Sequence, residues 1–80
     1  MPGLRIPDRE ITDRGKSIYR DQLKDLLEEG SRGKFVAIDV ETADYEVADE
    51  TIDAMVRLLE RVPDAQIWVE RIGYPVSFHA

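Results

Sequence analysis

The stretch from Phe35 to Thr42, FVAIDVET, most constrains the fold because apolar residues recur at every second position. Residues two apart on an extended chain point the same way. One side of this stretch carries Val36, Ile38 and Val40, and the other side carries Ala37, Asp39 and Glu41. The alternation predicts a half-buried β-strand, with Asp39 and Glu41 on its solvated face.

The residues after this strand predict a hairpin and then a helix. A turn over residues 42–44 would return the YEVA segment antiparallel to the strand, with Tyr45 and Val47 facing inward. Asp49 is a suitable cap for a helix over residues 50–62. We expect this helix to face the sheet with Ile52, Met55, Val56 and Leu59, a stripe that Leu58 widens.

The AQIWVERIG segment at residues 65–73 predicts a further strand because branched and aromatic residues dominate it. If Ile67 and Val69 face the second helix, Trp68 faces the other side of the sheet. The YPVSFHA segment that follows either continues this strand past a bulge or returns as a short edge strand.

The N-terminal third predicts an extended arm over residues 1–10 and an amphipathic helix over residues 11–29, whose pattern already begins near Asp8. Gly15 weakens the first part of that helix by about 1 kcal/mol relative to alanine, so residues before Lys16 would fray or form a separate turn. The apolar stripe of the helix consists of Ile18, Tyr19, Leu23, Leu26 and Leu27.

Two packing arrangements are possible for this first helix. It either covers the sheet beside the second helix, or it presents its apolar stripe to another chain. Trp68 has the same two alternatives, since it could pack beneath the first helix or anchor an interface. The candidate partner-binding residues are therefore Ile18, Tyr19, Leu23, Leu26, Leu27 and Trp68.

The element order of helix, strand, strand, helix, strand predicts one small α+β domain over residues 11–80 with a mainly antiparallel sheet. A chain of 80 residues buries only about 60% of its unfolded surface, so oligomerisation or a partner would add stability. Cysteine is absent, and no apolar run is long enough to span a bilayer. Both features favour a cytoplasmic protein without a membrane partner.

Charge is unevenly distributed along the chain, whose formal net charge is −6. Residues 1–34 hold eight Lys or Arg against seven Asp or Glu, whereas residues 35–80 hold three against ten. Because phosphate backbones are bound by cationic side chains, the second half disfavours a nucleic-acid partner. An acidic surface complements a basic protein, although it also simply keeps small domains in solution.

Two carboxylates raise the question of metal-dependent hydrolysis. Asp39 and Glu41 would point the same way on a strand and could share Mg²⁺ or Mn²⁺, as in exonucleases. A two-metal nuclease needs further carboxylates and a general base, and the acidic residues that follow lie in a turn and a helix start. The sequence therefore predicts no catalytic, metal-binding or cofactor-binding residue.

Three stretches, GKSIYRDQLKDLLEE, GKFVAIDVETADYEVADE and RVPDAQIWVERIGY, resemble a family of small bacterial proteins that are often suspected to be antitoxins. The resemblance covers most of residues 15–80, and its recurring motifs match residues 33–39, 44–46, 63–65 and 71–73. Such proteins are encoded beside PIN-type ribonuclease toxins or small aspartic proteases. The resemblance implies a small protein that binds and restrains an enzyme, and Ala43 departs from the usual turn glycine of the family.

Three hypotheses follow for the function. The first is a non-catalytic, antitoxin-like module whose first helix contacts a nuclease toxin or protease, while the acidic hairpin steers the encounter. The second is a self-associating domain, a homodimer closed by the same stripe or by an edge strand at residues 76–78. The third and least favoured is a metal-dependent hydrolase that uses Asp39 and Glu41.

Overall fold

The structure is a computed structural model that describes residues 5–74 of the 80. The N-terminal helical region consists of α1 (Asp8–Ile18), a π-helical turn η1 (Tyr19–Leu23) and α2 (Lys24–Glu28). The remaining elements are β1 (Phe35–Asp39), β2 (Tyr45–Ala48), α3 (Thr51–Arg61) and β3 (Ile67–Arg71). The segment expected to follow β3 lies, beyond Tyr74, outside the described residues.

The three strands form an antiparallel sheet in the order β2-β1-β3. Val36 pairs with Val47 in the hairpin of β1 and β2, which confirms the predicted return strand. On the other side of β1, Ile38 pairs with Trp68 of β3. The sheet and its helices confirm the predicted α+β class.

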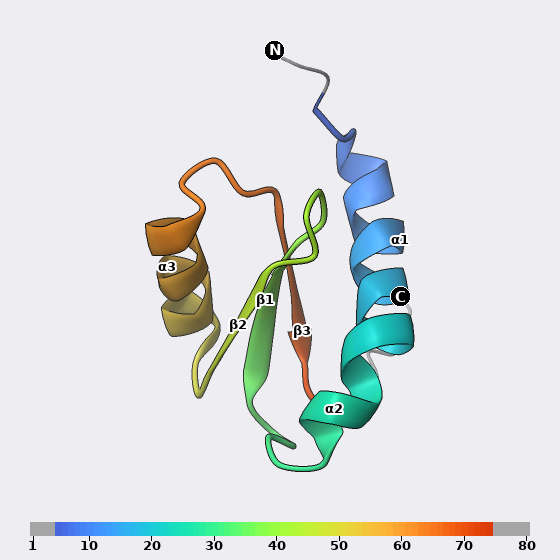
Figure 1. The fold of residues 1–80 in the computed structure, drawn as a ribbon, viewed down its shortest axis with the longest axis vertical. Helices are drawn as coiled ribbons and strands as arrows, with labels where there is room; N and C mark the ends of the chain where they lie inside the picture. The colour runs from blue at the N-terminus through green and yellow to red at the C-terminus, as the bar shows by residue number, and fades with distance from the viewer. Residues whose placement is uncertain (1–4, 75–80) are drawn as a thin grey trace.

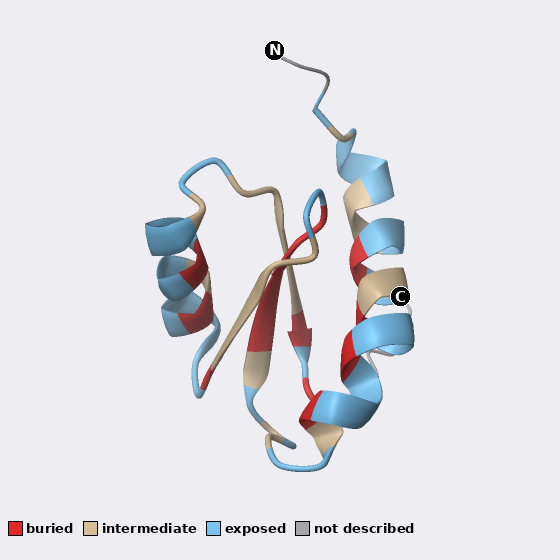
Figure 2. Cartoon of the chain, in the orientation of Figure 1, coloured by how far each residue is buried: buried red, intermediate tan, exposed pale blue. Residues whose placement is uncertain are grey.

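Helices cover both faces of this sheet. In Figure 1, α3 lies on one side of the three strands and the α1–α2 region lies on the other. The first helix therefore covers the sheet, which was one of the two predicted alternatives. It does not lie beside α3, as that alternative stated, but on the opposite face of the sheet. The result is a three-layer arrangement in which both faces of β1 are buried (Figure 2).

Each face has its own core. On the α1–α2 face, Tyr19, Leu23 and Leu27 are buried against the sheet, and their partners in this cluster are Val36, Ile38 and Ile72. The core on the α3 face is built of small residues around one large one, namely Ala37, Ala48, Ala54 and Leu58. Alanine on both surfaces lets α3 approach the sheet closely.

The N-terminal helical region is unbroken from Asp8 to Glu28, so the expected fraying before Lys16 is wrong. The physical reason lies in Gly15, which is buried directly against Trp68 of β3. Its missing side chain allows the backbone of α1 to approach the sheet, and the resulting packing offsets the low helix propensity of glycine.

The π-helical turn adjusts the direction of the buried side chains. Gly15, Tyr19, Leu23 and Leu27 follow one another at spacings of four residues, and all four are buried. A regular α-helix has 3.6 residues per turn, so such a row would drift around the helix by about 40° at each step. The wider turn, in which Lys24 N–H donates to the Tyr19 carbonyl, counteracts this drift.

The turn between β1 and β2 contains a strained residue. Ala43 has a φ of 69°, in the left-handed region that glycine adopts most easily. Its amide donates to the Asp39 carbonyl at 2.7 Å, and the Asp39 amide donates to the Asp44 carbonyl at 2.8 Å. The hairpin thus closes without a turn glycine, at a conformational cost of about 1–2 kcal/mol.

The described part of the N-terminal arm is attached to the chain that enters β3. The Ile6 amide donates to Gln66 Oε1, and Gln66 Nε2 donates back to the Ile6 carbonyl, both at 2.9 Å. Arg5 also donates to the Asp64 carbonyl at 3.1 Å. Among residues 5–74, every helix is too short or too polar to cross a membrane.

Candidate functional site: an exposed apolar row on α3

The outward side of α3 carries apolar side chains that the sheet does not cover. Ile52 is 66% exposed, Val56 47% and Leu59 37%. Their spacings of four and three residues place them on one side of the helix, which we call the outer row. The sequence predicted that these residues face the sheet, and this prediction is wrong: Ala54 and Leu58 face it instead, and both are fully buried.

Acidic side chains border the outer row. Asp53 and Glu60 lie three and four residues from Val56, and Asp49 precedes the helix; all three are exposed. The two arginines of α3 bind to β2 instead of lying beside the outer row. Arg57 donates to the Val47 carbonyl at 2.9 Å, and Arg61 donates to the Glu46 carboxylate at 2.6 Å. The outer row is therefore an apolar surface with an anionic border.

The structure places the predicted partner-binding residues mainly inside the protein. Tyr19, Leu23 and Leu27 are buried, and Ile18 and Trp68 are half-buried against the same core. Only Leu26 points outward, with 61% of its surface exposed. A partner that used the whole stripe would have to displace the sheet, so contact through these residues stays a prediction.

The sequence predicted that Asp39 lies on a solvated face, and this prediction is wrong. The helix α3 covers that face of the sheet, and Asp39 is only 1% exposed. Its carboxylate accepts hydrogen bonds from the Glu41 amide at 3.0 Å and from Thr42 Oγ1 at 3.2 Å. Glu41 lies beyond the end of β1 and is exposed. In residues 5–74, no three His, Asp or Glu side chains form a group that could hold a metal ion.

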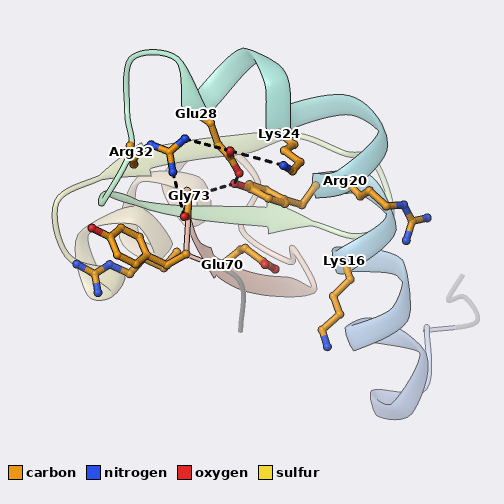
Figure 3. A pocket seen from close by; sticks show the side chains of 10 residues that line it. Lys16, Arg20, Lys24, Glu28, Arg32, Glu70 and Gly73 are labelled. Carbon is orange, nitrogen blue, oxygen red and sulfur yellow. Dashed lines mark hydrogen bonds and ion pairs between the residues drawn. The ribbon is translucent and has the colours of Figure 1, made fainter. Parts of the chain in front are cut away.

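A cavity of about 520 Å³ lies between the N-terminal helical region and the end of β3. Figure 3 shows Glu28 at one side of the cavity between Lys24 and Arg32, which approach its carboxylate at 3.6 and 3.5 Å. The Tyr19 hydroxyl donates to Glu28 at 2.9 Å and accepts from the Gly73 amide at 3.1 Å. This network connects α2 to the end of β3.

The pKa of Tyr19 is raised above its ordinary value of 10.0. Burial, which disfavours the phenolate, is the main cause; the hydrogen bond from Gly73 acts in the opposite direction, and the hydrogen bond to Glu28 raises the pKa further. The folded protein therefore holds this proton to a higher pH than the unfolded chain does.

We expect this difference to make the fold sensitive to alkali. The unfolded chain loses the Tyr19 proton above about pH 10 while the folded protein keeps it, so the stabilisation is complete below about pH 10 and is lost as the pH rises further. Urea unfolding between about pH 9 and pH 11 should show a steeper loss of stability for the natural chain than for Tyr19→Phe. Equal slopes for the two proteins would contradict the expectation.

Comparisons with protein-family models, curated proteins and solved structures found no match to this chain. The fold and the surface therefore define it only as a small α+β domain with a three-stranded antiparallel sheet between two helical layers. Its function has to be inferred from the surfaces that the described residues form.

Proposed function

We propose that this protein is a non-catalytic, antitoxin-like module that binds and restrains a partner enzyme. The observation that supports the proposal most directly is the outer row of α3, where Ile52, Val56 and Leu59 stay exposed in a domain that buries little surface overall. Covering this row would remove apolar surface from water and stabilise a complex.

The border of the outer row indicates the chemistry of the partner. Asp53 and Glu60 place negative charge along one side of the outer row, Asp49 before the helix is paired with Lys34, and the chain as a whole carries −6. Complementary charge accelerates association and fixes orientation. Nucleases bind phosphate backbones through cationic surfaces, so an acidic chain could cover such a surface and exclude the substrate. This charge pattern agrees with the role that the resemblance to suspected antitoxins implies.

The proposal places the contact on α3 instead of the first helix. The stripe of the first helix already covers its own sheet, so its use by a partner would require part of the fold to open. The outer row needs no such opening. The first helix nevertheless offers Leu26, and the two surfaces can be compared directly because Leu26 and Val56 are both exposed.

The test is affinity capture from the native cytoplasm, with the natural chain, Val56→Glu and Leu26→Glu as matched baits. Both substitutions add the same charge at an exposed position, so circular dichroism should show that both variants are folded. We expect one enzyme to be retained by the natural chain and by Leu26→Glu and to be lost with Val56→Glu. The purified natural chain should then inhibit that enzyme.

Other results would contradict parts of the proposal. Loss of the enzyme with Leu26→Glu but not with Val56→Glu would return the contact to the first helix. An enzyme that is captured but keeps full activity would exclude a restraining role. If light scattering shows a dimer of the 9.2 kDa chain that Val56→Glu dissociates, the outer row closes a homodimer and the self-associating alternative replaces the proposal.

A further inference from the structure

The two edges of the sheet are protected to different extents. At the β2 edge, Arg57 donates to the Val47 carbonyl at 2.9 Å and Arg61 donates to the Tyr45 carbonyl at 3.1 Å. These carbonyls point away from β1, because in this register the neighbouring residues of β2 bond to β1. Cationic side chains therefore occupy the edge where another strand would have to pair.

The β3 edge has no comparable protection in residues 5–74. The Val40 amide donates to the Gln66 carbonyl, and the Ile72 amide donates to the Lys34 carbonyl. By alternation, the main-chain groups of Ile67 and Val69 point away from β1. No hydrogen bond joins these groups to another described residue. Within the described residues 5–74, this edge is therefore open for pairing with an extended chain.

The cavity beside β3 gives this edge a positive charge. Its walls carry five cationic side chains against two carboxylates, a net charge of +3 on a chain of −6: Lys16, Arg20, Lys24, Arg32 and Arg71 against Glu28 and Glu70. We call Lys16, Arg20 and Lys24, which recur every fourth residue, the basic row. Figure 3 shows Lys16 and Arg20 extending from the helix away from both of these carboxylates, and Arg20 forms an ion pair at 3.0 Å with Asp21, which does not line the cavity.

The two acidic groups of the cavity already have partners. Glu28 is approached by Lys24 and Arg32, and Glu70 accepts a hydrogen bond from Trp68 Nε1 at 2.8 Å. Lys16 makes no ion pair with any residue between Arg5 and Tyr74. Its positive charge is therefore available to an anionic group that enters from the β3 edge.

We propose that the β3 edge binds an extended acidic segment of a partner protein, which pairs with Ile67 and Val69 as a fourth strand. Alternate side chains of an added strand project to the same face as Trp68 and Glu70. Carboxylates at those positions reach the basic row across the cavity, while the other side chains lie on the α3 face. Main-chain pairing supplies affinity, and the basic row selects acidic sequences.

The charge pattern favours such a partner over a second copy of this chain. Antiparallel pairing of two β3 strands about a two-fold axis would place both N-terminal helical regions on one face. The basic row of one copy would then meet the basic row of the other, and like charges repel. This proposal uses the face opposite the outer row of α3, so it stands or fails independently of the proposed function.

The experiment titrates the full chain with a synthetic peptide of alternating Val and Glu that is long enough to pair with all of β3. Trp68 is the only tryptophan and is hydrogen-bonded to Glu70 at the cavity wall, so its fluorescence reports occupancy. We expect saturable binding that is about tenfold tighter than that of an alternating Val and Lys peptide and that weakens with salt.

Variants and modified peptides separate strand pairing from simple attraction. Lys16→Glu and Arg20→Glu should each weaken binding about tenfold, whereas Lys34→Glu, which changes an exposed lysine paired with Asp49 outside the cavity, should not. N-methylation of the peptide amides that face β3 should abolish binding. N-methylation of the amides that face away should leave it intact.

Hydrogen exchange tests the open edge directly. The Ile67 and Val69 amides should exchange rapidly in the free protein and become protected by the peptide. Slow exchange of these amides in the free protein would overturn the proposal, as would equal binding of the two N-methylated peptides. A shortened chain ending at Tyr74 that binds the peptide much more tightly than the full chain would show that residues 75–80 occupy the site, which also overturns it.

Discussion

Replacing Gly15 with alanine is expected to destabilise the fold by about 2 kcal/mol, although alanine is the better helix former. A side-chain carbon at this position would lie 2.5 Å from Trp68 Cβ and closer still to Cγ and Cδ1. These atoms are the root of the indole side chain, so a rotamer change cannot move them all away. Overpacking of this kind typically costs about 1–3 kcal/mol, and a contact with the side-chain root belongs at the upper end or beyond. The gain of about 1 kcal/mol in helix propensity offsets only part of it.

Thermal unfolding would measure the effect as a fall of about 10 °C in Tm. Gly30→Ala is the matched control, because apart from its chain neighbours no residue has an atom within 4 Å of the added carbon at that position. In a double-mutant cycle, Trp68→Ala should remove only part of the cost of Gly15→Ala, because alanine lacks Cγ and Cδ1 but keeps the Cβ that lies 2.5 Å from the added carbon. A Tm for Gly15→Ala equal to that of the natural chain would show that α1 does not lie against Trp68 in solution.

The alternation of apolar residues was enough to predict β1 and its antiparallel pairing with β2, whereas the place of β3 on the other side of β1 was not predicted. Val36 and Ile38 form one buried row with Tyr45 and Val47 beside them, as expected from a period of two. Such a pattern specifies which side chains share a face. It does not specify how many faces are covered, and this is why Asp39, a polar residue in the opposite row, was wrongly assigned to solvent.

Helix positions that depend on close approach were harder to predict. Gly15 suggested a weak helix because propensity describes an isolated segment, whereas its missing side chain makes room for Trp68 in the folded protein. The π-helical turn has no sequence signal of its own beyond the four-residue spacing of the buried row. In both cases tertiary packing decides, and a local pattern contains no information about the neighbouring strand.

The candidate site was missed for a related reason. Apolar residues occupy more than half of the circumference of α3, so periodicity alone could not decide which side faces the sheet. The largest residues were assigned to the core, but the sheet below α3 presents Ala37 and Ala48. A helix approaches such a surface most closely with a small residue of its own, here Ala54. The alanines at positions 37, 48 and 54 were the sequence feature that could have identified the side of α3 that faces the sheet.

Leu58 and Leu59 provide the strongest test of how α3 is oriented. Leu58→Ala is expected to cost about 2–5 kcal/mol, because Leu58 is fully buried and is the one large residue of its core cluster. Leu59→Ala should cost less than about 1 kcal/mol, since Leu59 is 37% exposed and alanine favours the helix. The two substitutions remove the same atoms from adjacent positions, so urea unfolding compares burial alone.

The size of the Leu58 effect also bears on function. A domain of 80 residues has a total stability of about 4–12 kcal/mol, so Leu58→Ala removes a large part of it. If α3 instead faced the sheet with the outer row, Leu59→Ala would be the costly change and Leu58→Ala the mild one. That reversal would bury the surface proposed for the partner. The expected order, with Leu58 costly and Leu59 mild, leaves Ile52, Val56 and Leu59 exposed to a partner while α3 stays attached to the sheet.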